Sequence, residues 1–173
     1  MNLTNLKKIL TNQPLDPPDK LNWGDAIGLW NICNFKIIGM TMIEIFLAQA
    51  KDQELRNSLN MGIELLIVPH IEKIQQYLHK QGLEVPAVPQ RKNLDIVGKS
   101  VEPNTIIQDD EIGNTLKEVF RLGLVLDMQS LSIAINEDVS NMIWDILDAD
   151  YKGYREMIKL CKTKNWLTMI PTV

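Results

Sequence analysis

The sequence predicts an all-α protein in which a single domain forms a four-helix bundle. Residues 22–50, 52–82, 109–136 and 139–161 each repeat apolar side chains with the period of an α-helix. No segment shows the alternation of apolar and polar residues that is typical of a β-strand. A polar connection punctuated by prolines, at about residues 83–108, separates the second helix from the third. The expected order is therefore hairpin, crossover and hairpin.

A short lead-in precedes the bundle. Residues 1–21 contain three prolines, which prevent early helical turns from continuing into the first long helix. The bundle domain is expected to span residues 22–170, because the apolar tail that begins at Trp166 can fold back on one end of the bundle.

The first helix is expected to begin after Asn22, a suitable N-cap, with Asp25 in the first turn where the helix dipole favours a negative charge. Its expected core stripe is Trp23, Ile27, Trp30, Ile38, Ile45 and Ala48. The second helix should end near Gly82, a suitable C′ residue, and Pro69 is expected to bend it. The link between these helices is short, so they should be antiparallel neighbours.

The connection at residues 83–108 is long for a compact domain and needs a structural reason. Extended, it exceeds the ~40 Å length of one of these helices, so it can run along the bundle and make the second and third helices parallel. One long crossover is typical of ferritin-like bundles. The complete prediction is a four-helix ferritin-like bundle, made of two antiparallel hairpins joined by a long crossover after an N-terminal lead-in.

The third helix should start at Asp109, Asp110 and Glu111, because carboxylates are favoured at the positive end of a helix dipole. Its expected core stripe is Ile112, Leu116, Val119, Phe120, Leu126, Leu131 and Ala134. A turn at residues 136–138 leads to the last helix. The stripe of that helix is Val139, Met142, Ile143, Ile146, Leu147, Tyr154, Met157, Ile158 and Cys161.

Composition argues against several classes of function. The formal net charge of the chain is −4 and its basic residues are scattered, so no nucleic-acid surface is expected. The two cysteines do not imply a disulfide framework, and they suit a reducing compartment. The first residues do not resemble a signal peptide, and the most apolar run, residues 37–50, is too short to span a bilayer. The expected location is the cytoplasm.

Three segments carry a family resemblance. They are Leu29-Trp30, Val85-Pro86-Ala87-Val88-Pro89 and Trp166-Leu167 with Pro171. With these features the chain resembles a ferritin-like family from spore-forming bacteria, mostly uncharacterised and related to spore coat protein F, over roughly residues 15–172. The resemblance implies a ferritin-like fold and an association with the spore coat, and it implies no defined reaction.

One polar side chain on each helix is expected to point into the core at a similar height. The four residues are Asn34, His70, Asp127 and Asp150. A buried carboxylate must be paired or neutralised, so His70 is expected to contact Asp127 or Asp150. We favour a hydrogen-bonded core cluster that fixes helix register, with a degenerate metal or small-ligand site as the alternative.

A working di-iron centre is not expected. Ferritin-like di-iron proteins use a Glu-x-x-His motif on each of two helices. Here the residues that end in His70 read Ile67-Val68-Pro69-His70, and the last helix has no histidine. We therefore predict no metal and no cofactor.

The first and third helices carry more apolar residues than one core face can use. The surplus consists of Leu29, Ile32, Met40, Ile43, Phe46 and Leu47 on the first helix, and Leu122, Leu124, Val125, Met128 and Ile133 on the third. The lead-in and crossover could cover this patch, or a second copy of the chain could. We favour a homodimer through these two helices. The candidate interface residues are Ile43, Phe46, Leu47, Val125 and Met128.

No enzymatic motif is evident, and no catalytic residue is predicted. Ser130 and Ser132 have no histidine partner at a recognisable spacing, and glycine-rich phosphate loops are absent from the sequence. The leading interpretation is a non-enzymatic structural or interaction protein that self-associates. It would lie in the spore coat and associate there with other coat proteins. The alternative is a metal- or small-ligand-binding protein of the ferritin-like group.

Overall fold

The computed structural model describes residues 21–91 and 107–167. Across these residues the chain is helical and contains no strand. The elements are α2 (Trp23–Gln49), α3 (Gln53–Gly62), the π-helix η1 (Ile63–Ile67), α4 (Val68–Lys80), α6 (Asp109–Ile133) and α7 (Glu137–Thr163). Because α3, η1 and α4 follow without a break, the described part of the chain forms four long rods, and the predicted all-α bundle is confirmed.

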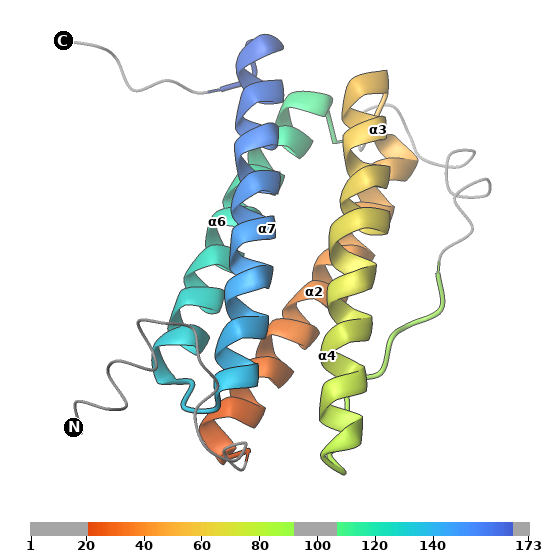
Figure 1. Ribbon diagram of the computed structural model, residues 1–173. Coiled ribbons are helices and arrows are strands. Elements are labelled where there is room, and N and C mark those ends of the chain that lie inside the picture. Colours follow the sequence, from red (N-terminus) through yellow and green to blue (C-terminus); the bar gives the residue numbers. More distant parts are fainter. Residues whose placement is uncertain (1–20, 92–106, 168–173) are drawn as a thin grey trace, which may run out of the picture.

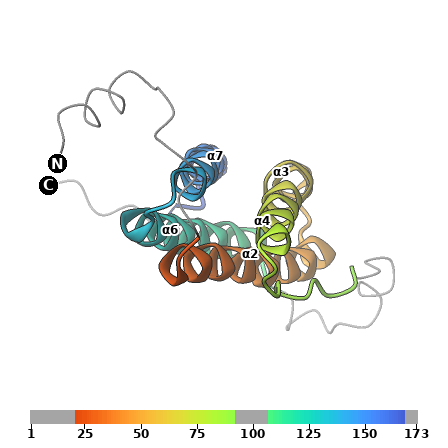
Figure 2. The ribbon, with the colours of Figure 1, turned by 60° about the horizontal axis from the view of Figure 1, so that its bottom comes forward.

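The rods form two antiparallel hairpins. In Figure 1, α2 runs from the lower to the upper end and α3–η1–α4 returns, whereas α6 runs from the upper to the lower end and α7 returns. Since α4 ends at the lower end and α6 begins at the upper end, the connection between them must cover the length of the bundle. Figure 2 shows α2 beside α6, with α7 over α6 and the α3–α4 rod over α2.

The predicted helix ends follow local chemistry. The side chain of Asn22 accepts a hydrogen bond from Asp25 N at 3.0 Å, and the Asp25 carboxylate accepts one from Asn22 N at 3.3 Å. This capping box fixes the start of α2. At the end of α4, Gly82 has φ 74° and donates to the carbonyl of His79. A left-handed glycine after the last turn is a common helix terminus.

A π-helical turn, η1, precedes Pro69, where the sequence predicted a bend. Proline has no N–H, and its ring collides with the carbonyl four residues earlier in a regular α-helix. Here the turn before Pro69 is widened, and Val68 N donates to Ile63 O, five residues back. The wider turn absorbs the proline without ending the rod.

The core face of α2 differs from the predicted one. Most of the expected stripe faces outward: Trp23, Ile27, Trp30, Ile38 and Ile45 are all exposed. The core is filled instead by Leu29, Ile32, Met40, Ile43, Phe46 and Leu47. Both faces of this helix are apolar, so periodicity alone could not tell them apart.

The same composition makes α2 long and apolar enough to cross a membrane by length and hydropathy alone. Half of its most apolar window is buried inside the bundle, which is also the property of a core helix.

Two aspartates join the hairpins at opposite ends of the bundle. Asp25, in the first turn of α2, accepts hydrogen bonds from Ile135 N at 2.8 Å and Asn136 N at 3.3 Å, in the turn between α6 and α7. Asp109, the first residue of α6, accepts from Lys51 N at 2.8 Å and Asp52 N at 3.0 Å, in the turn between α2 and α3. Each hairpin therefore supplies a carboxylate to the turn of the other.

The described parts of the crossover and the tail pack on the bundle. Arg91 forms an ion pair with the buried carboxylate of Glu44 on α2. Trp166 and Leu167 pack against the core, and the Asn114 side chain donates to Trp166 O at 2.7 Å. Residues 1–20 of the lead-in, residues 92–106 of the crossover and the last six residues lie outside the described part of the chain.

Candidate functional site

One polar side chain from each rod meets inside the bundle. They are Lys36 on α2, His70 on α4, Asp127 on α6 and Asp150 on α7. The Lys36 Nζ lies 2.6 Å from Asp150 Oδ2, and the His70 Nδ1 lies 3.5 Å from Asp150 Oδ1. Asp127 interacts with the Asp150 carboxyl group from the neighbouring helix. We call these four residues the polar cluster.

Lys36 takes the place that the sequence suggested for Asn34. Asn34 is only partly buried, and none of the described hydrogen bonds or ion pairs joins it to the polar cluster. The two residues differ by about 200° around the helix axis, so only one of them can face the core. The sequence contains one feature that points to Lys36: it is the lone charged residue between Asp25 and Glu44. A single charge inside an apolar helix that packs in a core needs a buried partner.

The charges of the polar cluster depend on burial and on Lys36. Burial raises the pKa of Asp127 to about 7, and the adjacent negative charge of Asp150 acts in the same direction against the opposing effect of Lys36. Burial also favours a higher pKa for Asp150, but its contacts with His70 and Lys36 outweigh this and lower the pKa of Asp150. Asp150 is thus the ionised partner of Lys36, and Asp127 keeps its proton into the neutral range.

Two buried atoms of the polar cluster have no hydrogen-bond partner among the described residues. They are His70 Nδ1 and Asp127 Oδ2. The 3.5 Å between His70 Nδ1 and Asp150 Oδ1 is at the limit for a hydrogen bond. Unpaired polar atoms are uncommon in protein interiors, and each calls for a physical explanation.

The donor set gives the metal interpretation no support. No group of three His, Cys, Asp or Glu side chains within residues 21–91 and 107–167 is arranged to hold a metal ion. The Lys36 ammonium already supplies the positive charge that Asp150 requires. A cation bound there would have to overcome repulsion from that ammonium.

Neither cysteine is an activated nucleophile. Cys33 and Cys161 are buried and free. Burial raises the pKa of Cys33 to about 11 and also raises the pKa of Cys161. Both thiols are therefore protonated at neutral pH, and a thiol in that state is a weak nucleophile.

The predicted interface residues divide into two groups. Ile43, Phe46 and Leu47 are buried in the core of the bundle, so their assignment to an outer face was wrong. Val125 and Met128 on α6 are exposed, as are Leu122 and Ile133 on the same helix. The outer apolar residues of α2 are instead Trp23, Ile27, Trp30, Ile38 and Ile45. We call the exposed apolar residues of α2 and α6 the outer apolar face.

Comparison with known proteins identifies the family and the fold. A crystal structure of a candidate spore coat protein from Bacillus halodurans C-125 is similar, with a TM-score of 0.82 and 23% sequence identity. The similarity covers 90% of this chain and 96% of that chain, and at this identity it establishes the fold alone. No curated protein matches the chain.

A family model described as "Protein of unknown function (DUF3231)" matches residues 11–173. This match extends through all four rods and the connection between the hairpins. The chain therefore belongs to the DUF3231 family of proteins of unknown function.

Proposed function

We propose that this chain is a non-enzymatic structural protein of the spore coat that self-associates as a homodimer through α2 and α6. The outer apolar face carries this proposal. Trp23 is 78% exposed and Ile38 is 59% exposed on α2, while Met128 is 52% exposed on α6. The helices that carry these residues pack side by side.

The face is long enough to serve as an interface. From Trp23 to Ile45 the exposed residues of α2 extend over roughly 33 Å of helix. Exposed apolar residues that recur along a helix face commonly mark association sites. A two-fold axis would place the face of one copy against the same face of the other.

The proposed spore-coat location and the proposed ferritin-like topology rest on different observations. Two antiparallel hairpins, with α4 ending at one end of the bundle and α6 beginning at the other, favour a ferritin-like topology. The similar protein from Bacillus halodurans is itself a candidate spore coat component.

Sedimentation velocity at micromolar concentration tests the association. The chain should sediment as a dimer, and Ile38→Glu or Val125→Glu should convert it to a monomer by placing charge on the outer apolar face. Trp144→Glu is the matched control, because it places the same charge on an exposed apolar residue of α7, outside the outer apolar face. A monomeric parent protein would refute the dimer.

Fractionation tests the location. A tagged chain expressed in a sporulating host should be recovered in the coat fraction rather than in the spore core. Recovery only from the core would refute the coat assignment and would leave the sedimentation result to be judged separately.

A further inference from the structure

An apolar cavity of about 430 Å³ lies between the α3–η1 segment and α7, with α2 and α6 behind it. Its wall is mostly hydrophobic and includes Phe35, Leu59, Leu66, Leu116, Phe120 and Met157. An engineered cavity of roughly 150 Å³ holds benzene, and ligand sites commonly measure about 300–1,000 Å³. The cavity is therefore large enough for a ligand of more than one ring or an alkyl chain.

Two glycines show that this space is more than a local packing fault. A Cβ atom on Gly39 or on Gly62 would meet no atom within 4 Å, and both residues line the cavity. Each lies within a helical rod, where glycine is about 0.5–1 kcal/mol less favourable than alanine. No close contact requires either glycine, and what the two have in common is that they leave the cavity wide.

One end of the cavity is polar. Lys36 and Asp150 of the polar cluster line it. An ammonium has three N–H donors, and among the described residues the acceptor within reach of Lys36 is Asp150. Lys36 therefore has donors left for an acceptor inside the cavity. Because Lys36 and Asp150 balance each other's charge, a neutral group fits better there than an ion.

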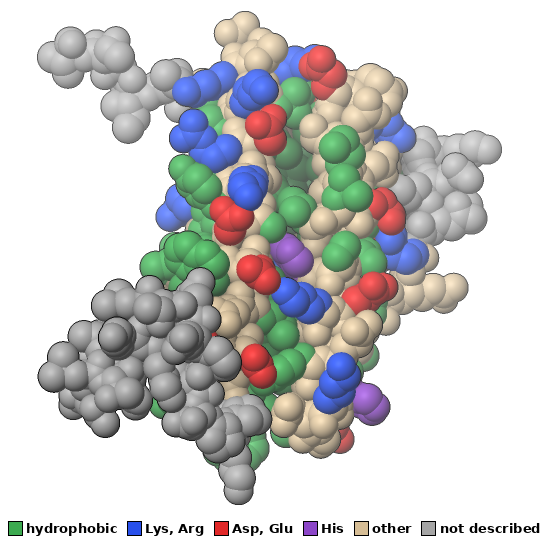
Figure 3. Space-filling view, viewed as in Figure 1, with side chains coloured by type: hydrophobic (Ala, Val, Ile, Leu, Met, Phe, Trp, Pro, Cys, Tyr) green, Lys and Arg blue, Asp and Glu red, His purple; other side chains and the backbone are tan. Residues whose placement is uncertain are grey.

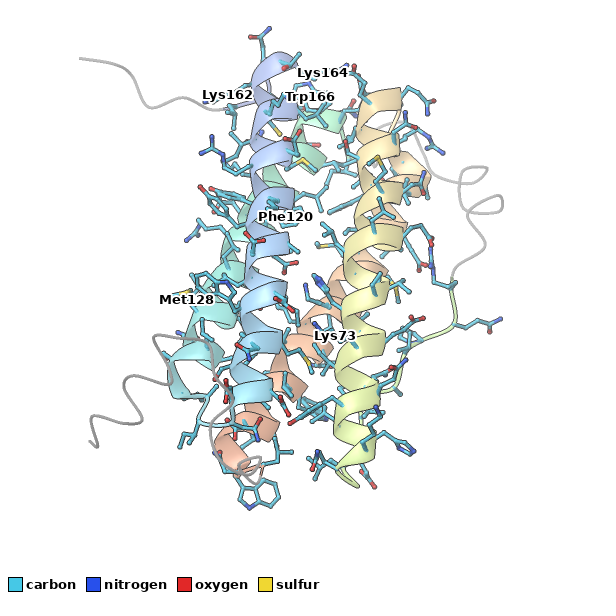
Figure 4. All side chains as sticks on the ribbon, in the orientation of Figure 1. Lys73, Phe120, Met128, Lys162, Lys164 and Trp166 are labelled. Atoms are coloured by element: carbon cyan, nitrogen blue, oxygen red, sulfur yellow. The ribbon has the colours of Figure 1, made fainter. Side chains whose placement is uncertain are left out.

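The cavity opens to solvent between two ion-paired ends. At the upper end Lys164 of the α7 C-cap lies 2.8 Å from Asp52, and lower down Lys73 on α4 lies 3.0 Å from Asp145 on α7. Figure 4 shows both lysines in the space between α7 and the α3–α4 rod. Between these pairs Figure 3 shows a furrow lined by hydrophobic side chains. Leu65, which is 64% exposed, lies at its rim.

We propose that this cavity binds a small neutral amphiphile, with its alkyl or aromatic part among the apolar walls and one oxygen acceptor on the Lys36 ammonium. Alcohols, ketones and esters of medium chain length belong to this class. The site is independent of the proposed dimer, because none of the residues that line the cavity belongs to the outer apolar face.

Calorimetric titration of the full chain with three probes of equal chain length tests the proposal. The probes are 1-octanol, octanoate and octylammonium, which differ in the charge of the polar end. Octanol should bind saturably at one site, and the two ions should bind at least about tenfold more weakly because each would bring an unbalanced charge into the polar cluster. Absence of octanol binding, or equally tight binding of octanoate, would overturn the proposal.

Two variants locate the bound probe. Gly39→Leu fills the cavity from α2, and Gly62→Leu fills it from α3, so each should abolish octanol binding while circular dichroism shows a folded bundle. Asn31→Leu adds the same side chain on the exposed side of α2 and should bind octanol like the parent. If a folded Gly39→Leu or Gly62→Leu variant still bound octanol with the affinity of the parent, the site would lie elsewhere and the assignment would be wrong.

Discussion

The two sides of this bundle use glycine in opposite ways. Where α2 meets α6, a Cβ on Gly28 would lie 3.3 Å from the Cβ of Ser130, and a Cβ on Gly123 would lie 3.2 Å from Phe35 Cε1. Glycine here lets two helices approach closely. Where α3 and η1 face α7, Gly39 and Gly62 border open space. We call these the closed side and the hollow side of the bundle.

The comparison of these glycines distinguishes residues that serve helix packing from residues that serve the cavity. On the closed side a larger residue has no room, so glycine serves packing. At Gly39 and Gly62 a larger residue would fit, so these two glycines leave the cavity open, whereas Gly153 on α7 packs tightly against Leu66 and Phe120 in the same wall. The polar cluster borders the hollow side, and its Lys36–Asp150 pair is a buried ion pair there.

The largest expected effect comes from removing the carboxylate of that pair. Asp150→Ala should lower the free energy of unfolding by about 3–5 kcal/mol, because it leaves the Lys36 ammonium buried without a counter-charge. Urea unfolding measures this loss. Asp145→Ala is the control, since Asp145 pairs with Lys73 on the surface and should contribute about 0–1 kcal/mol. Equal losses in the two variants would mean that Lys36 can reach solvent.

Asp25→Ala tests the contact that joins α2 to the end of α6. Loss of the Asp25 carboxylate breaks the capping box of α2 and leaves the N–H groups of Ile135 and Asn136 without this acceptor. The free energy of unfolding should fall by about 2–3 kcal/mol. Asp109→Ala removes the corresponding contact at the other end, where the bond from Lys51 N is exposed, and should lose about 1 kcal/mol. Thermal unfolding should therefore rank Asp25→Ala below Asp109→Ala in stability.

Asp127→Asn tests the buried acid of the polar cluster. Because burial raises the pKa of Asp127 to about 7, the folded protein binds a proton that the unfolded chain has already released. The Asp127 carboxyl therefore makes the parent less stable as the pH rises from about 4 to 7, and the penalty stays constant above that range.

The amide of Asp127→Asn does not titrate, so the variant should be at least about 1 kcal/mol more stable than the parent at pH 8. The two proteins should approach the same stability at about pH 3, below the ordinary aspartate pKa, where the carboxyl is mostly protonated in both states. Urea unfolding at several pH values measures the difference. A difference that does not change with pH would show that Asp127 is ionised throughout.

The smallest expected effects compare two glycines of α2 directly. Gly39→Ala should raise the free energy of unfolding by about 0.5–1 kcal/mol, since alanine favours the helix and its Cβ meets no neighbour. Gly28→Ala should gain less or lose stability, because its Cβ presses on Ser130 of α6. Denaturant midpoints of the two variants give the comparison. Equal gains would show that the closed side can separate at little cost.

Sequence alone predicted the helix ends better than the helix faces. Asn22 with Asp25, Gly82, and the acidic start at Asp109 act through contacts within a few residues, so local chemistry identifies them. The face of α2 depends on which of two apolar sides meets the other helices. Ile38 and Ile43 are equally apolar, yet the first is exposed and the second is buried.

The candidate site was predicted in part for the same reason. His70 and Asp150 lie on helices whose polar and apolar sides are distinct, and the structure brings both together with Asp127 of α6. Lys36 was missed because lysine is rarely buried, and Asn34 was chosen from the wrong face of α2. The cavity left no signal that sequence reading could use, since Gly39 and Gly62 resemble the glycines of the closed side until their surroundings are known.

The exchange of carboxylates between the hairpins affects how the bundle comes apart. Asp25 reaches the turn of the second hairpin, and Asp109 reaches the turn of the first. A hairpin released from its partner would therefore lose an acceptor for its turn as well as its apolar cover. Neither half is complete alone, so heating or denaturant should unfold the protein in one cooperative transition without a populated single-hairpin intermediate.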